Sequence, residues 1–293
     1  MQKLSSKKFI YFVILHYQAL QVTIECINSI KKLSQDVVGI RIVVVDNASP
    51  NKSGIQLKEL YSDDMRVSVI INKENNGFAK GNNMGFAYAK NSGADFIVLI
   101  NNDTLIKDLL FGEKILSIYE ENKFGVLGPD ILSINDGIHQ NPTKGFRITR
   151  GEVGKRIVKA RLILLANKCG LTNFLYRHRD TNKVYNNDYK NQYTVTSDYL
   201  YVLHGSCLIF SPEYIQVFDG LNDKPFMYYE EYILAYECMK KNIKMIYSPE
   251  VAIEHYRNVS TNSSISQKDL KKKINFYYTE SLKSLKVLHS ILK

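Results

Sequence analysis

Three apolar runs in the first third of the chain each stop abruptly at polar residues. Phe9–Leu15, Ile40–Val45 and Phe96–Ile100 are rich in β-branched and aromatic side chains. Apolar runs of this length, interrupted only by Arg41 in the second, are typical of strands that are buried on both faces. Helix-like segments separate them, and this alternation predicts an α/β fold with a mostly parallel central sheet flanked by helices.

The same patterns continue along the chain. They predict helices at Ala19–Lys32, Gln56–Tyr61, Phe86–Lys90, Ile115–Glu121 and Glu231–Asn242, and strands at Phe124–Pro129, Leu200–Phe210 and Met245–Tyr247. Residues 133–200 are rich in Tyr, Asn, Lys and Arg, which predicts an irregular insertion. Ser266–Leu292 carries apolar residues at helical spacing among lysines, which predicts a C-terminal amphipathic helix.

Polar, ligand-capable residues follow all three apolar runs. His16, Asp46 and Asp103 stand at or just beyond the three strand ends. In open α/β sheets, ligands bind at the carboxyl ends of the strands. The alternative for Asp103 is a cap on a helix starting near Ile106, because aspartate is a favoured N-cap. The recurrence at three strand ends favours a binding site.

A glycine- and amide-rich turn, Asn75–Gly85, lies between the second and third of these runs. Its glycines allow the backbone to approach a ligand closely, and Lys80 offers a cation. A solvated lysine at a helix end is the alternative for Lys80. The glycines recur every four residues, unlike the dinucleotide fingerprint, and no Walker A lysine is present, so these two nucleotide-binding classes are disfavoured.

Five blocks of sequence, taken together, resemble the inverting family 2 glycosyltransferases, particularly their bacterial rhamnosyltransferase-like branch. In order and spacing the blocks cover about residues 8 to 262. They are Val-Val-Asp46-Asn-Ala-Ser, Glu-Asn75-Asn-Gly77-Phe-Ala-Lys-Gly81-Asn82-Asn, Leu-Ile-Asn-Asn-Asp103-Thr, the set His204-Gly205-Ser206 with Phe218-Asp219-Gly220 and Glu230-Glu231, and His255-Tyr-Arg-Asn-Val-Ser260.

The resemblance implies a GT-A type nucleotide-sugar-binding fold over residues 1–262. Residues 1–105 would form the nucleotide-binding half and 106–262 the acceptor-binding half, with the insertion at 133–200 and a basic amphipathic helix at 263–293. It also implies inverting transfer of a sugar from a dTDP- or UDP-sugar, with dTDP-rhamnose as the favoured donor. The implied acceptor is a glycan or lipid-linked oligosaccharide in polysaccharide assembly.

The resemblance also assigns residues to the donor site. The aspartate that matches Asp46 binds the nucleoside in the family. The other residues expected to line the donor cleft are His16, Tyr17, Gln18, Asn47, Asn75, Gly77, Lys80, Asn82 and Asn102.

Asp103 is expected to hold a divalent cation, Mg²⁺ or Mn²⁺, against the donor diphosphate. His255 matches the second metal or diphosphate contact of the family, although a lone histidine is more often structural. The general base of the family is the second acid of a Glu-Asp pair, which here is Glu231 after Glu230. Two acids at a helix start also suit the helix dipole, which is the structural alternative.

Departures from the family pattern keep a second function open. The acid pair is Glu-Glu, and Ile233 and Glu237 stand where relatives commonly carry an acid and an arginine. A non-catalytic nucleotide-sugar or glycan-binding subunit that has lost its base is therefore the alternative. Loss of donor hydrolysis on changing Glu231 to Gln would separate the enzyme from the binder.

Composition limits the partners and the location. The 293 residues carry a net charge of +10, concentrated in Lys144–Arg179 and Lys268–Lys293, without any nucleic-acid-binding signature. We expect no nucleic acid partner and attribute the charge to anionic lipid or donor phosphates, with a solvated basic face as the alternative. The four cysteines lack metal-site or disulfide spacing, which indicates a reducing compartment.

No signal core or transmembrane run is evident, so a cytoplasmic protein is expected, with peripheral contact at the inner face of the cell membrane. The tail suggests how that contact would form. Its apolar stripe among lysines suits either a membrane-surface helix or a helix that packs on the catalytic domain with its lysines in water. The stripe comprises Ile274, Tyr277, Tyr278, Leu282, Leu285 and Leu288.

Replacing Asp46 with alanine should weaken the binding of a nucleotide-sugar donor and of the free nucleoside diphosphate by similar factors. The predicted contact is to the nucleoside, which both ligands share, so it is uniform binding and not transition-state stabilisation. Isothermal titration calorimetry measures both affinities. Unchanged nucleotide affinity would refute the assignment.

Overall fold

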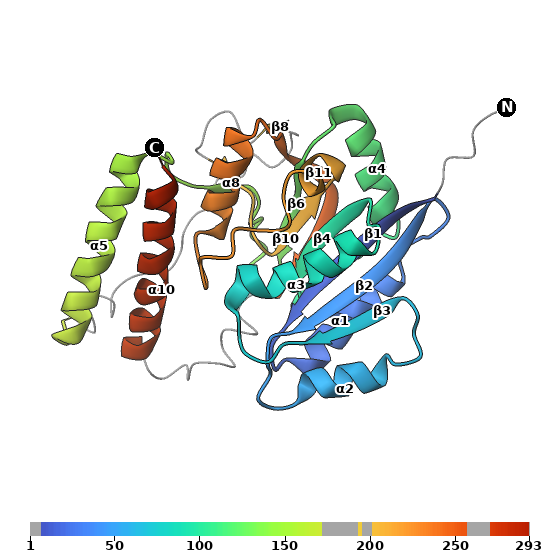
Figure 1. The fold of residues 1–293 in the computed structure, drawn as a ribbon, viewed down its shortest axis with the longest axis horizontal. Helices are drawn as coiled ribbons and strands as arrows, with labels where there is room; N and C mark the ends of the chain where they lie inside the picture. The colour runs from blue at the N-terminus through green and yellow to red at the C-terminus, as the bar shows by residue number, and fades with distance from the viewer. Residues whose placement is uncertain (1–6, 172–192, 195–200, 257–269, 293) are drawn as a thin grey trace.

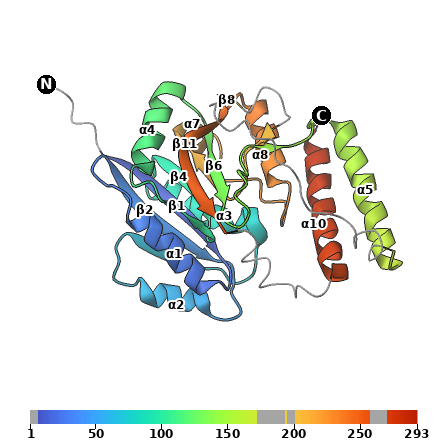
Figure 2. The same ribbon diagram turned by 180° about the vertical axis from the view of Figure 1, so that it is seen from behind.

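The computed structural model describes residues 7–171, 193–194, 201–256 and 270–292. Part of the expected insertion and the end of the His255 block, through Ser260, lie outside these residues. One large twisted sheet carries helices on both faces, and the helices α5 and α10 stand side by side next to it (Figures 1 and 2). The predicted α/β class with a mostly parallel central sheet is confirmed.

Strands and helices alternate in the first half of the chain, as the apolar pattern predicts. The elements are β1 Lys8–His16, α1 Leu20–Lys31, β2 Val38–Asp46, α2 Ser53–Leu60, β3 Val67–Ile71, α3 Gly77–Asn91 and β4 Phe96–Asn101. The sequence analysis missed β3, a short edge strand that is mostly half-buried, so its residues lack the signature of a buried run.

The second half mixes strand directions. Its elements are β5 Thr104–Leu105, α4 Phe111–Asn122, β6 Val126–Ser133, β7 Thr143–Lys144, α5 Arg150–Lys168, β8 Tyr193–Thr194, β9 Tyr201–Val202, β10 Cys207–Phe210, α7 Pro212–Ile215, α8 Glu230–Lys240, β11 Met245–His255 and α10 Leu270–Ile291. The predicted strand over 200–210 is interrupted by residues 203–206, so only its two ends are extended.

The large sheet has the order β3-β2-β1-β4-β10-β6-β11-β5. The long pairings, β1 with β2 and β4, β2 with β3, and β6 with β11, are parallel, whereas β10 runs antiparallel between β4 and β6. In this register His16 lies beside Asp46, and Leu15 lies beside Asn101. The polar residues that follow β1, β2 and β4 therefore share one edge of the sheet.

The two faces of the sheet build two apolar layers. Alternate residues of β1 point to opposite faces, so Phe12 joins the layer beneath α1, α2 and α4, and Val13 joins the layer beneath α3 and α8. Figure 1 shows α3 in front of the sheet, and Figure 2 shows α1 on the opposite face. Both layers are needed because strands of a parallel sheet are buried on each side.

Helix α3 begins at Gly77, not at Phe86 as predicted, so most of the expected turn is helical. The four-residue glycine period explains this correction, because these glycines lie on one face of the helix. A Cβ atom at Gly85 would lie 2.3 Å from Val13 Cγ1, and one at Gly81 would lie 2.7 Å from Leu15 Cδ1. Glycine therefore lets α3 pack directly on β1.

Asp103 does not cap a helix. It is followed by β5, and the next helix, α4, begins only at Phe111. β5 pairs antiparallel with the end of β11, with Thr104 opposite His255. The capping alternative for Asp103 is therefore wrong, and the pairing brings a second polar residue beside this carboxylate.

The expected irregular insertion contains a long helix, so this expectation is wrong over Arg150–Lys168. Thr149 caps α5 by accepting a hydrogen bond from the Glu152 N–H. The helix packs along α10, and the Asn167 side chain donates to the Lys271 carbonyl at 3.0 Å. Sequence patterning missed α5 because its inward face is covered by a helix more than 100 residues away in the chain.

The predicted tail helix is confirmed as α10. Ile274, Leu285 and Leu288 of its apolar stripe are buried, and the Ser284 hydroxyl donates to the Met227 carbonyl at 2.9 Å. The stripe thus packs on α5 and on the part of the fold around α8, which supports the second interpretation of the tail. No helix in the described ranges has the length and hydrophobicity needed to cross a bilayer.

Candidate functional site

The polar ends of β1, β2 and β4 form the first part of the site. The Asp46 carboxylate is buried, and both its oxygens lie 3.3 Å from the Ser49 N–H. Gly54 provides the space for this carboxylate, because a Cβ there would lie 2.2 Å from Asp46 Cγ. A carboxylate accepts about four hydrogen bonds, so this group retains capacity for a ligand.

His16 lies behind this edge and not on its surface. It is fully buried, and its Nδ1 and Nε2 atoms lie 2.7 Å from Thr23 Oγ1 and 2.8 Å from Ser53 Oγ. Burial lowers the pKa of His16 to about 4, a fall that the nearby Asp46 carboxylate partly opposes. The ring is therefore neutral at pH 7 and supports the site from within.

A chain of hydrogen bonds runs through His16 and ties together α1, α2 and the end of β4. The Asn102 side-chain amide donates to Thr23 Oγ1 at 3.0 Å, and Ser53 Oγ donates to Asn51 Oδ1 at 2.7 Å. The Thr23 hydroxyl in turn donates to the Ala19 carbonyl at 3.0 Å, so the His16 ring lies in one continuous chain of hydrogen bonds between the two hydroxyls. Asn102, predicted to line the cleft, is buried in this chain.

Asn47 holds the turn that precedes α3. Its amide nitrogen donates to Asn75 Oδ1 at 2.9 Å and to the Gly77 carbonyl at 3.0 Å. Its amide oxygen accepts from the Asn76 N–H and the Asn72 side chain, at 3.0 and 3.3 Å. This one buried side chain therefore fixes the end of β2 to the start of α3.

The remaining predicted donor residues surround this core. Tyr17 and Gln18 are half-buried in the loop after β1, where the Gln18 N–H donates to Ser49 Oγ at 2.8 Å. Lys80 is exposed in the first turns of α3. Asn82 is buried and donates to the Phe78 carbonyl at 3.0 Å, so it stabilises α3.

Asp103 and His255 form a close pair at the end of β11. Asp103 Oδ1 lies 3.2 Å from His255 Nε2, and both side chains are buried. On the other side of the ring, Nδ1 lies 2.7 Å from Gln140 Oε1, an atom that only accepts. Nδ1 therefore carries a proton, and in the neutral ring the Nε2 lone pair faces the carboxylate.

This arrangement fits a divalent cation. Two lone-pair donors that face each other need a proton or a metal ion between them, and the Gln140 contact sets the tautomer that metal-bound histidines adopt. Two ligands about 2.1 Å from Mg²⁺ at a right angle lie about 3 Å apart. No cluster of three or more metal-binding side chains occurs among the described residues, so phosphate and water would complete the shell.

Two carboxylates, Glu230 and Glu231, begin α8. The residues before them, Tyr228 and Tyr229, both have left-handed backbones, with φ of 72° and 65°. Large side chains rarely adopt this conformation, and such strain is typical of functional sites. The turn directs both carboxyl groups to the lining of one cavity.

Burial raises the pKa of both acids. The pKa of Glu230 rises to about 8, first because the carboxyl group is buried and then because Glu231 is close. One oxygen of Glu230 has no hydrogen-bond partner among the described residues. The pKa of Glu231 is also raised by burial, while the Gly205 N–H at 3.3 Å opposes that rise. Burial therefore favours the protonated form of both carboxyl groups.

The cavity beside these acids has a volume of about 370 Å³ and is rich in aromatic side chains. Phe146 and Tyr232 stack with ring centres 4.4 Å apart, and the Arg156 guanidinium lies 3.7 Å from the centre of Phe146. Tyr228 and Tyr229 complete this aromatic wall. Apolar faces with a few convergent polar groups are typical of small-molecule sites.

Residues 204–206 join the cavity to the Asp103–His255 pair. The Ser206 carbonyl accepts a hydrogen bond from the Asn101 N–H at 2.9 Å, and the Gly205 N–H donates to Glu231. The centre of the His204 ring lies 6.0 Å from the centre of the His255 ring. The Asp103–His255 pair and the acid pair therefore flank one short segment.

Several residues of this site could not be found from the sequence, among them Gln140, Arg156 and His204. Gln140 and Arg156 lie in the segment that was expected to be irregular, where no local pattern marks them. His204 belongs to a block that carries the family resemblance, but the resemblance assigned it no role. The block itself was the only available signal.

Comparisons with known proteins agree with this geometry. Residues 11–190, more than half of the chain, match the family model described as Glycosyl transferase family 2. The low-salt glycan biosynthesis hexosyltransferase Agl10 of Haloferax volcanii is 25% identical over 74% of this chain and 60% of its own length. The dTDP-rhamnosyl transferase RfbF of Shigella flexneri is 30% identical over 34% of this chain and 32% of its own length. The chain thus spans less than two thirds of either relative.

The fold is similar to that of S. aureus TarS, residues 1–349, in complex with UDP. The TM-score is 0.56 at 14% identity, and the match covers 93% of this chain and 70% of that chain. Identity this low shows the fold alone, and it confirms the expected GT-A type.

The raised pKa of Glu230 predicts how stability depends on pH. Between about pH 5 and pH 8 the folded protein keeps a proton that the unfolded chain releases, so the free energy of unfolding should fall as pH rises. Glu230→Gln removes this group and should make the fall smaller. Urea unfolding from pH 5 to pH 8.5 measures the effect. The exposed Glu121→Gln is the control, and equal pH profiles for wild type and Glu230→Gln would contradict the prediction.

Proposed function

The chain belongs to glycosyl transferase family 2, and from this premise we propose that it transfers a sugar from a nucleotide-sugar donor to a glycan hydroxyl. One observation carries the proposal: the Asp103–His255 pair and the Glu230–Glu231 cavity flank the same segment, residues 204–206. Sugar transfer needs a diphosphate site beside a site for an acceptor hydroxyl and its base. The position of the two halves on one segment supports this proposal.

The donor proposed is a nucleotide sugar, with dTDP-rhamnose favoured. The similarity to RfbF, named a dTDP-rhamnosyl transferase, supports that sugar, and TarS was solved with UDP. Asp46 would bind the nucleoside from the turn after β2, and Lys80 would face the phosphates. The acceptor would be a growing or lipid-linked glycan, since Agl10 is named for glycan biosynthesis. The unpaired state of all four cysteines is consistent with a reducing cytoplasm.

Asp103 and His255 would hold a divalent cation, with His255 oriented by Gln140. The bound cation would supply charge stabilisation for the diphosphate as it leaves. The protein's own part is to fix two ligands in a buried position and to leave the remaining positions to the donor.

Glu231 would act as the general base. As the acceptor oxygen forms its bond to the anomeric carbon, the Glu231 carboxylate takes the hydroxyl proton, and the bond from that carbon to the diphosphate breaks. A single displacement of this kind inverts the anomeric configuration. The Glu230 carboxyl, protonated at neutral pH because of its raised pKa, limits charge repulsion beside an ionised Glu231.

Glu231→Gln should lower kcat by a factor on the order of 10²–10⁴ and leave donor binding nearly unchanged, because a base acts only in the transition state. Initial rates of nucleoside diphosphate release, with calorimetry for donor affinity, measure both quantities. Glu237→Gln, a matched change on the same helix, should retain most activity. Normal turnover by Glu231→Gln, with loss of activity in Glu230→Gln, would show that Glu230 and not Glu231 is the base. Donor binding by wild type without turnover would instead favour the non-catalytic subunit.

Asp103→Ala should abolish the divalent-dependent transfer while the protein remains folded. The substitution removes the carboxylate ligand but leaves β5 paired with β11 through its backbone. Activity is measured across a Mg²⁺ or Mn²⁺ titration, with circular dichroism as the check on folding. Full activity of wild type in excess EDTA, or of Asp103→Ala, would exclude the metal role.

A further inference from the structure

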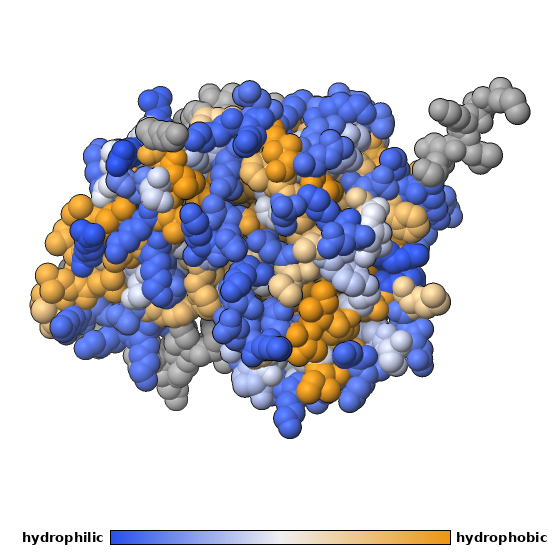
Figure 3. Space-filling view, in the orientation of Figure 1, coloured by the Kyte–Doolittle hydropathy of each residue, from blue (hydrophilic) through white to orange (hydrophobic). Residues whose placement is uncertain are grey.

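Helix α5 has two apolar faces, and the part of the chain that the structure describes covers only one of them. Val153 and Ala160 on the inner face are buried. On the opposite face, Val158, Leu162 and Leu165 are 55%, 61% and 61% exposed. Their spacing of four and three residues puts them in one stripe along the helix. Figure 3 shows this apolar surface at the edge of the molecule formed by α5.

Basic residues flank the stripe on both sides. At 100° per residue, Lys155 and Lys159 project on one side of it, and Arg161 and Lys168 on the other. All four side chains are exposed. The only acid in α5 is Glu152 in the first turn, where it pairs with Lys155 at 2.7 Å. The outer face of α5 is therefore apolar along its centre and cationic along its edges.

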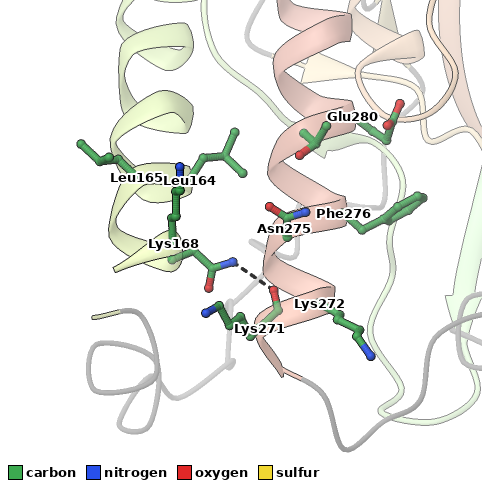
Figure 4. Close-up of a pocket in the computed structure, with 10 residues that line it drawn as sticks. Leu164, Leu165, Lys168, Lys271, Lys272, Asn275, Phe276 and Glu280 are labelled. Carbon is green, nitrogen blue, oxygen red and sulfur yellow. Dashed lines mark hydrogen bonds between the residues drawn. The ribbon is translucent and has the colours of Figure 1, made fainter. Parts of the chain in front are cut away.

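A groove between α5 and α10 extends this surface. It has a volume of about 970 Å³ and is lined by Leu164, Leu165 and Phe276, among others. In Figure 4, Lys168 and Lys271 lie at one end of the groove, where the two helices are joined by the Asn167 hydrogen bond. Leu165 belongs to both the stripe and the groove, so the two apolar surfaces are continuous.

We propose that the outer face of α5 docks on the surface of a membrane rich in anionic phospholipid. A helix that lies in a bilayer surface needs an apolar stripe to enter the headgroup boundary and cations beside it to meet anionic lipid. The face supplies both. A second copy of the chain is a poorer occupant, because two such faces would bring eight cations together.

This surface differs from the one that the sequence indicated. The tail stripe is largely covered by α5 and the neighbouring parts of the fold, and α5 presents the exposed stripe instead. Docking through α5 does not depend on the proposed reaction, since vesicle binding is measured without donor or acceptor.

Vesicle flotation with the full chain tests the proposal. Wild type should float with phosphatidylcholine vesicles that contain phosphatidylglycerol at low salt, and not with phosphatidylcholine alone. Leu162→Gln with Leu165→Gln should weaken binding by more than about tenfold. Lys159→Gln with Arg161→Gln should weaken it roughly 30-fold at low salt, because two cations leave the lipid surface.

Matched controls lie on the far side of the molecule. Leu60→Gln with Met65→Gln removes two exposed apolar side chains, and Lys32→Gln with Lys58→Gln removes two exposed charges. Both pairs should float like wild type. Because Leu162 and Leu165 are exposed, their variant should keep the wild-type urea midpoint, which separates lost docking from lost folding.

Several outcomes would overturn the proposal. These are no flotation of wild type, undiminished flotation of the Leu162/Leu165 variant, or an equal loss in the controls. A concentration-dependent dimer, seen by light scattering and abolished by the Leu162/Leu165 change, would assign the face to self-association instead.

Discussion

The position of β1 determines the rest of the structure. This strand is hydrogen-bonded to β2 on one side and β4 on the other, and its side chains fill both core layers. Because the three strands are parallel and in register, their polar ends meet at one edge. The glycine face of α3 packs on the same strand, so the turn before α3 is positioned by the same contact. Displacing β1 would therefore separate every group at this edge.

The three buried carboxyl groups of the site are each stabilised by a different local environment. Asp46, Asp103 and Glu230 are all buried, and burial of an ionised group is costly unless a partner offsets it. The structure treats each differently: Asp46 accepts a backbone N–H, Asp103 faces an imidazole, and Glu230 is protonated at neutral pH. These separate solutions give three carboxyl groups distinct chemical characters within one region.

The sequence predicted what local pattern encodes. Continuous apolar runs located β1, β2 and β4, and the polar residues after them located Asp46 and Asp103. The start of α3 was misplaced because its glycines look like a turn until they meet β1. Helix α5, and with it Arg156, was missed because its inner face is buried against α10, which is far away in the chain. The role of Gln140 likewise could not be predicted, because it depends on the contact with His255, which is 115 residues away.

The contact between Gly77 and Phe226 limits which sequence changes this part of the molecule can accept. The Phe226 carbonyl accepts a hydrogen bond from the Phe78 N–H, near the start of α3, at 2.8 Å. A Cβ at Gly77 would lie 2.2 Å from the same oxygen. The loop that leads to the acid pair is thereby joined to the start of α3. The two parts are not modular: a loop taken from another protein fits here only if it presents a backbone carbonyl at the same point. Side chains around this joint can change without breaking it, because the hydrogen bond joins backbone atoms only.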